Sequence, residues 1–499
     1  MSCKIDILAA AHESVCTARP THGTRLQVEK KLASVKGRLV IVGFGSIGQG
    51  VLPLILRHIA IDRARITIIT ADEYGWQFAQ ECGVADFRRQ PLSRVNYLDV
   101  LGPLLSEGAF LLNLSVNVSS TALIELCQER GALYLDSCVE PWEGGYVDAN
   151  LAPAQRTNYA LREQALAINR RPVRVRPTAL ITHGVNPGLV SHFTKQALLD
   201  MARVVGDEGP IPLTREGWAR LAMRLGVKAI HVAECDSQVS GRPKRQGEFV
   251  NTWSAEAFIS EGSQPAEMGW GTHEHSFPTA GRAHAGGCRA AIYLEQPGVS
   301  VRVRSWAPLA GAYHGFLITH AESISIADYL SVHEGSELVY RPTVHYAYHP
   351  CDDAVLSIDE FVGRDYVPQV SQRLLREEIT AGTDELGVLL CGHPRGVYWY
   401  GSRLDVVEAR RLAPRNNATT LQTAAGVLAG LVWVLENPER GVVEAEEMDF
   451  ERAMAIARPY LGTLVGVWGD WTPLQGHRAL FRESLDRDDP WQFGNVLVR

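Results

Sequence analysis

A regular pattern of hydrophobic and polar positions begins at Arg38. The segment 38–58 has in turn the pattern of a buried strand, a glycine-rich turn and an amphipathic helix. Apolar runs recur at 66–70, 111–116 and 132–139, with the helical pattern TALIELCQER between the last two. Short buried strands that alternate with helices predict a parallel sheet with helices on both faces.

The pattern changes after residue 186. Segments with alternating polar and apolar residues, such as SVRVRSW and TVHYAYH, lie among glycine, proline and aromatic residues, which is typical of a half-buried sheet. After Asn416 the sequence ATTLQTAAGVLAGLVWVLE indicates a long helix that packs back on the first unit. We expect a poorly ordered N-terminal extension (1–37), a parallel-sheet domain (38–185), an α+β substrate domain with a mixed or antiparallel sheet (186–410) and a C-terminal helical segment (411–499).

A glycine motif lies between the first predicted strand and helix. Gly43, Gly45 and Gly48 form G-x-G-x-x-G. In this context the first glycine permits a tight turn, the second lets the backbone approach a pyrophosphate, and the third allows close helix packing. The helix N-terminus, at Ser46 and Ile47, favours negative charge. A glycine turn without a ligand is the alternative, but the strand, helix and second strand together favour a Rossmann-type, doubly wound dinucleotide-binding domain.

The ribose-binding position differs from the usual pattern. The second predicted strand ends in Thr70-Ala71-Asp72-Glu73, so Thr70 stands where an acidic residue is expected and Asp72 is the nearest carboxylate. No arginine in this segment would hold a 2′-phosphate. The local sequence therefore favours NAD over NADP.

Composition and charge narrow the class of partner. The chain has 499 residues, of which 46% are hydrophobic and 21% charged, and it is long enough for two or three domains. The 49 Lys and Arg and 56 Asp and Glu give a net charge of −7, which disfavours nucleic acid and anionic membranes and suits a small cation. Nine scattered cysteines without a C-x-x-C pair fit a reducing cytoplasm. No stretch has the roughly 18 continuous apolar residues of a membrane span.

Acidic and aromatic residues dominate the candidate substrate site. Glu140 closes the fourth predicted strand, at the carboxyl end where such sheets bind ligands. Glu234, Glu261 and Asp384 are further candidates for an ammonium-binding cleft, and Trp253 is a candidate cation–π partner. Each of them alone is more often a solvated carboxylate or a core tryptophan.

Two polar residues at predicted strand-to-loop junctions complete the candidate set. Asn186 in HGVNPG is equally plausible as a turn residue, and His320 in LITHAES as a hydrogen-bonded core histidine. The run His345–Asp353 superficially resembles a metal cluster, but it lacks a third ligand at convincing spacing, so we interpret it as structural and expect no metal site. Arg302 and Arg304 share one face of a predicted strand, where they fit a carboxylate clamp or, more simply, salt bridges.

Longer strings of the sequence resemble the bacterial homospermidine synthase family. They run in order from about residue 38 to 499 and include VGFGSIGQGVLPLI, LNLSV, VEPW, NPG, NTWS, SEG, THAESISIADYL, RPTVHYAYHPCDDAVLS, DELGVLL and DPWQFGNVLVR. The resemblance implies a homodimer in which a Rossmann-type domain and a second α+β domain share tightly held NAD. It implies conversion of two putrescines into sym-homospermidine and ammonia.

The resemblance also assigns residues to this chemistry. The family's substrate-site residues carry over to Glu140, Asn186, Glu234, Trp253, Glu261, His320 and Asp384. For the cofactor we expect contacts from Gly43, Gly45, Ser46, Ile47, Gly48, Asp72, Asn113, Ser115 and Asn186. The chain departs from the family at Thr70, where the family can carry an acidic residue.

The residue chemistry fits the implied reaction. A putrescine ammonium must lose a proton before its carbon releases hydride to NAD, so a cleft carboxylate or His320 must act as base. Carboxylates and Trp253 can stabilise the iminium, the second putrescine amine displaces ammonia, and the same NADH reduces the new imine. The alternatives are a dehydrogenase of saccharopine or carboxynorspermidine type, whose substrates call for an arginine clamp, and a non-catalytic NAD-binding regulator.

Overall fold

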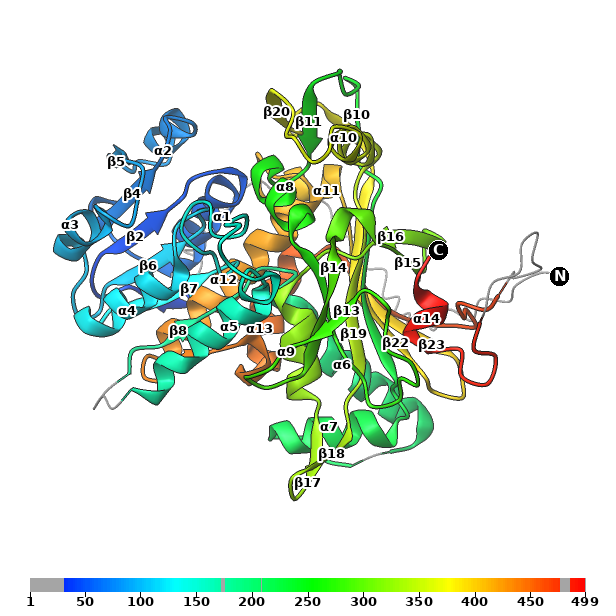
Figure 1. Ribbon diagram of the computed structural model, residues 1–499. Coiled ribbons are helices and arrows are strands. Elements are labelled where there is room, and N and C mark those ends of the chain that lie inside the picture. Colours follow the sequence, from blue (N-terminus) through cyan, green and yellow to red (C-terminus); the bar gives the residue numbers. More distant parts are fainter. Residues whose placement is uncertain (1–30, 172–175, 208, 476–484, 499) are drawn as a thin grey trace, which may run out of the picture.

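Two sheets organise the molecule, one in each half (Figure 1). The structure, a computed structural model, describes residues 31–171, 176–207, 209–475 and 485–498. The first sheet has seven strands, all paired in parallel, and the second has ten strands in a mixed arrangement. This confirms the prediction of a Rossmann-type α/β fold beside a second α+β domain.

The first sheet has the strand order β24-β8-β7-β6-β2-β4-β5. These strands are β2 (Leu39–Val42), β4 (Ile66–Thr70), β5 (Asp86–Arg89), β6 (Phe110–Asn113), β7 (Leu133–Asp136), β8 (Ala179–Leu180) and β24 (Val442–Val443). The strand order reverses at β2, which lies between β4 and β6. Ligands of open α/β sheets bind outside the carboxyl ends of the strands at such a point.

Helices cover both faces of this sheet. They are α1 (Ser46–His58), α2 (Trp76–Glu81), α3 (Tyr97–Leu101), α4 (Ser120–Arg130), α5 (Asn158–Ala167) and α12 (Ala418–Glu436). Leu39 and Ile41 of β2 pack with α1 and α12, whereas Val40 and Val42 pack with α4. A strand buried on both faces is continuously apolar, which explains why β2 is recognisable in the sequence.

Residues 31–37 also belong to this domain, although we expected order to begin at Arg38. β1 (Ala33–Ser34) pairs in parallel with β3 (Ile59–Ala60), and Val35 is only 2% exposed. A strand of two residues leaves no periodic signal in the sequence. The rest of the prediction of a poorly ordered extension concerns residues 1–30, which lie outside the described residues.

The second sheet has the order β13-β14-β12-β19-β9-β22-β23-β25, and the hairpin β15–β16 joins it through β19. Its strands are β9 (Ala229–Asp236), β12 (Pro265–Gly269), β13 (Gly281–Ala283), β14 (Ala291–Pro297), β15 (Arg302–Ala307), β16 (Gly311–Phe316), β19 (Thr343–His349), β22 (Thr383–Cys391), β23 (Val397–Asp405) and β25 (Thr463–Gly469). Shorter pairs flank it: β10 (Val239–Ser240) with β21 (Ile379–Ala381), β11 (Glu248–Asn251) with β20 (Ser371–Leu374), and β17 (Val332–Glu334) with β18 (Glu337–Tyr340).

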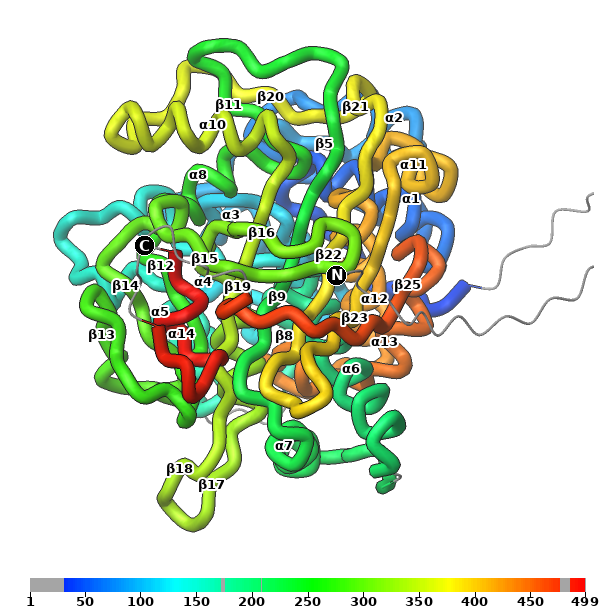
Figure 2. The backbone as a smooth tube through the Cα atoms, turned by 90° about the vertical axis from the view of Figure 1, so that its right-hand side faces the viewer, coloured from blue at the N-terminus to red at the C-terminus, as the bar shows by residue number. Residues whose placement is uncertain are grey.

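The two faces of the second sheet have different coverings. The remaining helices are α6 (Leu189–Val205), α7 (Arg215–Arg224), α8 (Ala255–Ser263), α9 (Ala321–Tyr329), α10 (Asp352–Gly363), α11 (Val406–Leu412), α13 (Phe450–Ala457) and α14 (Phe493–Val496). Val232 of β9 packs in the same cluster as residues of α6 and α9, whereas Ala233 faces Trp471 and Trp491. The C-terminal segment therefore lies on the face opposite these helices, and Figure 2 shows it crossing the strands of the sheet.

The segment after residue 411 contributes to both domains. α12 packs against α1 of the first domain, while β25 pairs with β23 at the edge of the second sheet. By length and composition α12 resembles a membrane span, with a hydropathy of 1.5, but 89% of that window is buried within the fold. It acts as a core helix between the two domains.

α12 also fixes a loop of the first domain, because Gly426 lies directly against Gly184. A Cβ on Gly426 would lie 1.9 Å from the carbonyl oxygen of Gly184. Gly426→Ala should therefore lower the melting temperature, since overpacking of this kind costs about 1–3 kcal/mol. The matched control is Gly363→Ala in α10, where a Cβ meets nothing within 4 Å. Equal melting temperatures for the two variants in a thermal scan would contradict this packing.

Candidate active site

A cleft of about 550 Å³ lies between the two domains, at the carboxyl ends of β2, β4 and β6. Most of the residues singled out from the sequence line it. They are Gly43, Gly45, Ser46, Ile47, Asp72, Ser115, Glu140, Asn186, Glu234, Trp253, Glu261 and His320. The structure thus brings together residues from both domains that are up to a few hundred positions apart in the chain.

The glycine turn after β2 has the shape that a pyrophosphate needs. Gly43 has a φ of +84°, and a Cβ there would lie 2.6 Å from the backbone of Leu114. A Cβ on Gly45 would meet nothing within 4 Å, so the space in front of this residue is open. α1 has no acidic residue in its first turn and no side chain that caps its N-terminus. Its N–H groups therefore remain available to an anion, and this fits a dinucleotide cofactor.

Gly48 and Asn113 support the cofactor loops from behind and do not line the cleft. A Cβ on Gly48 would lie 3.0 Å from the carbonyl oxygen of Gly43. Asn113, at the end of β6, is 1% exposed and accepts a hydrogen bond from the Ser115 hydroxyl at 2.6 Å. Its amide donates to the Tyr134 hydroxyl at 3.2 Å. Asn113 therefore orients Ser115, which does reach the cleft.

Thr70 and Asp72, together with Tyr74, line the end of the cleft where the sequence predicts the ribose to bind. Asp72 accepts a hydrogen bond from the backbone N–H of Tyr74 at 2.7 Å. Arg376, which the local sequence does not indicate, lies with its guanidinium over the Tyr74 ring at 4.7 Å from the ring centroid. Nη1 of Arg376 donates to Gln49 at 3.1 Å. This arginine comes from the second domain, so no local motif could indicate it.

Two carboxylates in the cleft are almost completely buried. Glu234, in β9, is 2% exposed and accepts hydrogen bonds from the Asn186 amide at 2.8 Å and the Tyr346 hydroxyl at 2.5 Å. Burial raises the pKa of Glu234 to about 8, although both hydrogen bonds oppose the shift. Glu140 is 5% exposed, and burial raises its pKa to about 8 against a backbone N–H from Asn117 at 3.4 Å.

His320 lies between two further carboxylates at the N-terminus of α9. Its Nε2 is 3.3 Å from Glu261 and its Nδ1 is 3.2 Å from Glu322, while its ring lies 4.4 Å from that of Tyr346. Burial alone would lower the pKa of His320, but Glu322 and Glu261 outweigh it and raise this pKa to about 10. Sequence reasoning missed Glu322 and Tyr346, although both stand inside the strings that carried the family resemblance.

Trp253 lines the cleft, whereas Asp384 lies behind it. Trp253 lines it, and its carbonyl oxygen accepts a hydrogen bond from the Ser46 hydroxyl of the glycine turn. Asp384 does not line it: this carboxylate lies behind Thr419, whose hydroxyl donates to Asp384 at 2.6 Å. Burial raises the pKa of Asp384. A direct contact between Asp384 and a ligand therefore has no support in the geometry, and its hydrogen-bond partner Thr419 is the residue that lines the cleft.

The other chemically suggestive residues have structural contacts. His345 lies against His231 in the core, with ring centroids 4.1 Å apart and the ring planes tilted by 46°. Arg302 lies over the Phe316 ring at 3.3 Å, and Arg304 donates to the carbonyl oxygen of Leu497 at 2.8 Å. Within the described ranges, no three His, Cys, Asp or Glu side chains form a group that could hold a metal ion.

The charge of the cleft indicates its ligand. Among the described residues that line it there is no lysine and no arginine, and His320 already faces two carboxylates. Glu140 and Glu234 are therefore buried acids without a lysine or arginine partner in the described lining, which is costly unless a ligand supplies the charge. A molecule with two ammonium groups fits this requirement.

Comparisons with known proteins match both domains. Residues 39–180 match the Saccharopine dehydrogenase NADP binding domain, and residues 184–470 match the Saccharopine dehydrogenase C-terminal domain. A homospermidine synthase of Blastochloris viridis is 54% identical over 470 residues, which cover 93% of this chain and 98% of that protein. A homospermidine synthase of Mesorhizobium japonicum is 50% identical over 472 residues, covering 93% and 97%.

A solved structure agrees with these relatives. The crystal structure of the homospermidine synthase from Legionella pneumophila in complex with NAD superposes with a TM-score of 0.87 at 50% sequence identity. The match covers 94% of this chain and 99% of that chain. The similarity therefore includes both domains.

Two variants test whether the cleft binds NAD at the glycine turn and the diamine at Glu234. Gly45→Val should weaken NAD binding about tenfold or more, because its side chain fills the open space in front of the turn. Glu234→Gln should leave NAD binding unchanged and weaken diamine binding by about tenfold, since it removes a charged partner. Calorimetric titrations of each variant with NAD and with putrescine measure both effects. Loss of NAD binding in Glu234→Gln, with normal NAD binding in Gly45→Val, is the result that contradicts this division.

Proposed function

This chain belongs to the homospermidine synthase family, and we propose that its cleft joins two putrescine molecules into sym-homospermidine with release of ammonia. The observation that carries this proposal is the group of buried carboxylates Glu140, Glu234 and Glu261 in a cleft whose described lining has no lysine or arginine. Putrescine has an ammonium group at each end, so it supplies the charge that these acids lack.

The same observation argues against the alternative reactions. Substrates of saccharopine or carboxynorspermidine type carry carboxylates, which are normally bound by a bidentate arginine. The described lining of this cleft offers none. A non-catalytic NAD-binding protein needs the glycine turn but has no use for buried carboxylates beside it, because they lower stability.

NAD, when bound at the glycine turn, supplies the chemistry by accepting a hydride and later returning it, so the overall reaction is redox neutral. The side chains of this protein move the protons. At neutral pH His320 holds its proton, since the pKa of about 10 set by Glu322 and Glu261 keeps it charged. The base that removes the amine proton is therefore a carboxylate. Glu234 and Glu140 suit this role, because a carboxyl group with a pKa of about 8 is a stronger base than an ordinary glutamate.

The later steps need stabilisation of a positive charge and a proton donor. Loss of hydride from the deprotonated amine carbon leaves an iminium ion, which the carboxylates and the Trp253 ring stabilise. The amine of the second putrescine adds to this carbon and loses a proton, and ammonia then leaves from it. Protonated His320 is the group that gives the leaving nitrogen its proton. Hydride return to the new carbon–nitrogen double bond completes sym-homospermidine.

Location and assembly are further parts of the proposal. The seven cysteines among the described residues are all free, which supports a reducing, cytoplasmic location. The homodimer implied by the family resemblance stays a prediction, and sedimentation equilibrium measures it directly.

The fate of the hydride tests the proposed function. With putrescine deuterated at both carbons that bear nitrogen, and excess unlabelled NAD, the product should retain every deuterium, because the hydride removed is the hydride returned. Mass spectrometry of the amines measures this. Absorbance at the NADH band should stay near its starting level, and steady accumulation of NADH in step with putrescine loss would identify an ordinary diamine dehydrogenase.

A further inference from the structure

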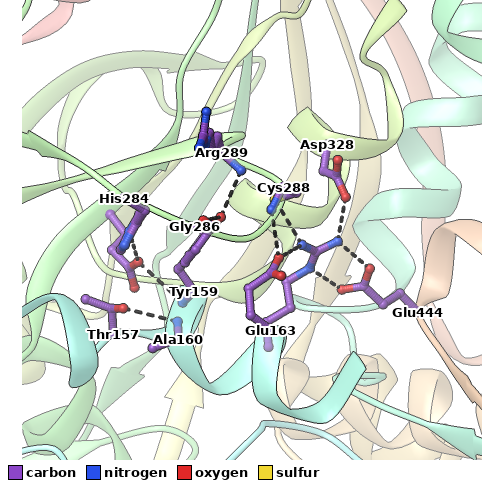
Figure 3. Close-up of polar contacts among 12 residues, drawn as sticks. Thr157, Tyr159, Ala160, Glu163, His284, Gly286, Cys288, Arg289, Asp328 and Glu444 are labelled. Atoms are coloured by element: carbon purple, nitrogen blue, oxygen red, sulfur yellow. Dashed lines mark hydrogen bonds and ion pairs between the residues drawn. The ribbon is translucent and has the colours of Figure 1, made fainter. Parts of the chain in front are cut away.

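Helix α5 belongs to the first domain, and residues of the second domain lie along one side of it (Figure 3). The Tyr159 ring stacks on His284 with centroids 3.9 Å apart, and its hydroxyl donates to the carbonyl oxygen of Gly286 at 2.6 Å. One turn later, Glu163 accepts a hydrogen bond from the backbone N–H of Cys288 at 3.3 Å. A single loop of the second domain thus follows one side of α5.

An ion-pair network joins α5 to the helix that carries His320. Arg162 is 3% exposed and binds Glu444 with two nitrogens at 2.6 Å and Asp328 at 2.8 Å. Asp328 lies near the end of α9, and His320 is the N-cap residue of the same helix. The far end of α9 is therefore fixed to the first domain.

Glu267 makes the corresponding connection at the near end of α9. This residue of β12 is fully buried, and its Oε2 accepts hydrogen bonds from the backbone N–H of Asn158 at 2.7 Å and the Thr319 hydroxyl at 2.8 Å. The side-chain amide of Asn158 donates to the same Thr319 oxygen at 3.1 Å. A carboxylate at a helix N-terminus is favourable for α5. Here it also holds the residue directly before His320.

We propose that Glu267 is a positioning residue for His320, an inference that rests on the role of His320 given above. Contacts within the second domain orient the imidazole against Glu261 and Glu322. Those contacts do not set its position relative to the glycine turn of the first domain. The hydrogen-bonded set of Glu267, Thr319 and Asn158 does, because it joins the two domains one residue before the ring.

Two variants that remove parts of this set test the proposal. Glu267→Gln removes the negative charge and replaces one of the two acceptor oxygens with an NH2 donor, and Thr319→Val removes the hydroxyl at nearly constant volume. We expect each to lower kcat about tenfold, since hydrogen bonds to a charged group are lost, while NAD affinity stays unchanged. Thr319→Ser, which keeps the hydroxyl, should have a kcat close to that of the wild-type protein. The matched control is Glu163→Gln, the same change of charge on the same domain joint but without a contact to Thr319.

The pKa of His320 gives a measurement that does not depend on turnover. Four groups face the ring: Glu261 from α8, Glu322 from α9, Glu234 from β9 and Tyr346 from β19. A displaced ring loses part of the interaction with Glu261 and Glu322, so its pKa should fall in Glu267→Gln and Thr319→Val. A pH titration followed by NMR of carbon-13-labelled histidine, assigned with His320→Gln, measures this shift in the NAD-bound protein.

The results of these experiments distinguish the positioning role of Glu267 from the proposed function. A lower His320 pKa in both variants, with wild-type values in Glu163→Gln and Thr319→Ser, supports positioning by Glu267. An unchanged pKa in Thr319→Val, or an equal shift in Glu163→Gln, overturns it. Failure of the wild-type protein to form sym-homospermidine from putrescine refutes the proposed function instead, and the titration still decides whether Glu267 positions the ring.

Discussion

Buried carboxylates without a balancing cation are the constraint on which this structure depends. Transfer of a carboxylate out of water costs several kcal/mol, and Glu140 and Glu234 are 5% and 2% exposed. Burial raises the pKa values of both carboxyl groups, so they are partly protonated near neutral pH, and this protonation lowers the cost. A cationic ligand offsets the cost of burying the groups that remain ionised. The positive charge of the substrate thus balances the negative charge of the site.

The two-domain architecture makes this arrangement possible. Glu140 follows a strand of the parallel sheet, whereas Glu234 lies in the central part of the mixed sheet, so the acids are buried only where the domains meet. Several contacts hold that junction: Ser46 with Trp253, Gly184 against Gly426 of α12, and Asn117 with Glu256 at 2.8 Å. A displaced domain would expose the acids to water and remove the reason for their raised pKa values.

The parts of the site that the sequence predicts are those fixed by local geometry. The glycine motif needs only a strand, a tight turn and a helix, and Gly43 has the positive φ that such a turn requires. Glu234, Glu261 and His320 are candidates by residue type and position, the family resemblance assigns them to the substrate site, and the structure places all three on one cleft. The predicted roles of all these residues stay predictions until variants are measured.

What the sequence could not predict depends on contacts between distant segments. Tyr346 reaches Glu234 because β19 pairs with β9, a register that no periodicity specifies. Asp384 is set back from the cleft because Thr419 of α12 lies in front of it. Arg376 reaches Tyr74 across the domain boundary. In each case one residue gives no signal about the other until the fold brings their segments together.

Proton release on diamine binding tests the central claim most directly. If putrescine supplies the charge that Glu140 and Glu234 lack, its binding must ionise them, so protons leave the protein at pH values near or below their pKa of about 8. Titration of NAD-depleted protein with putrescine in two buffers of different ionisation enthalpy counts these protons. The account predicts net release near pH 7, less release above pH 9, and a smaller count in Glu140→Gln and Glu234→Gln. Binding without proton release at pH 7, or the release of as many protons by both variants as by the wild-type protein, would contradict it.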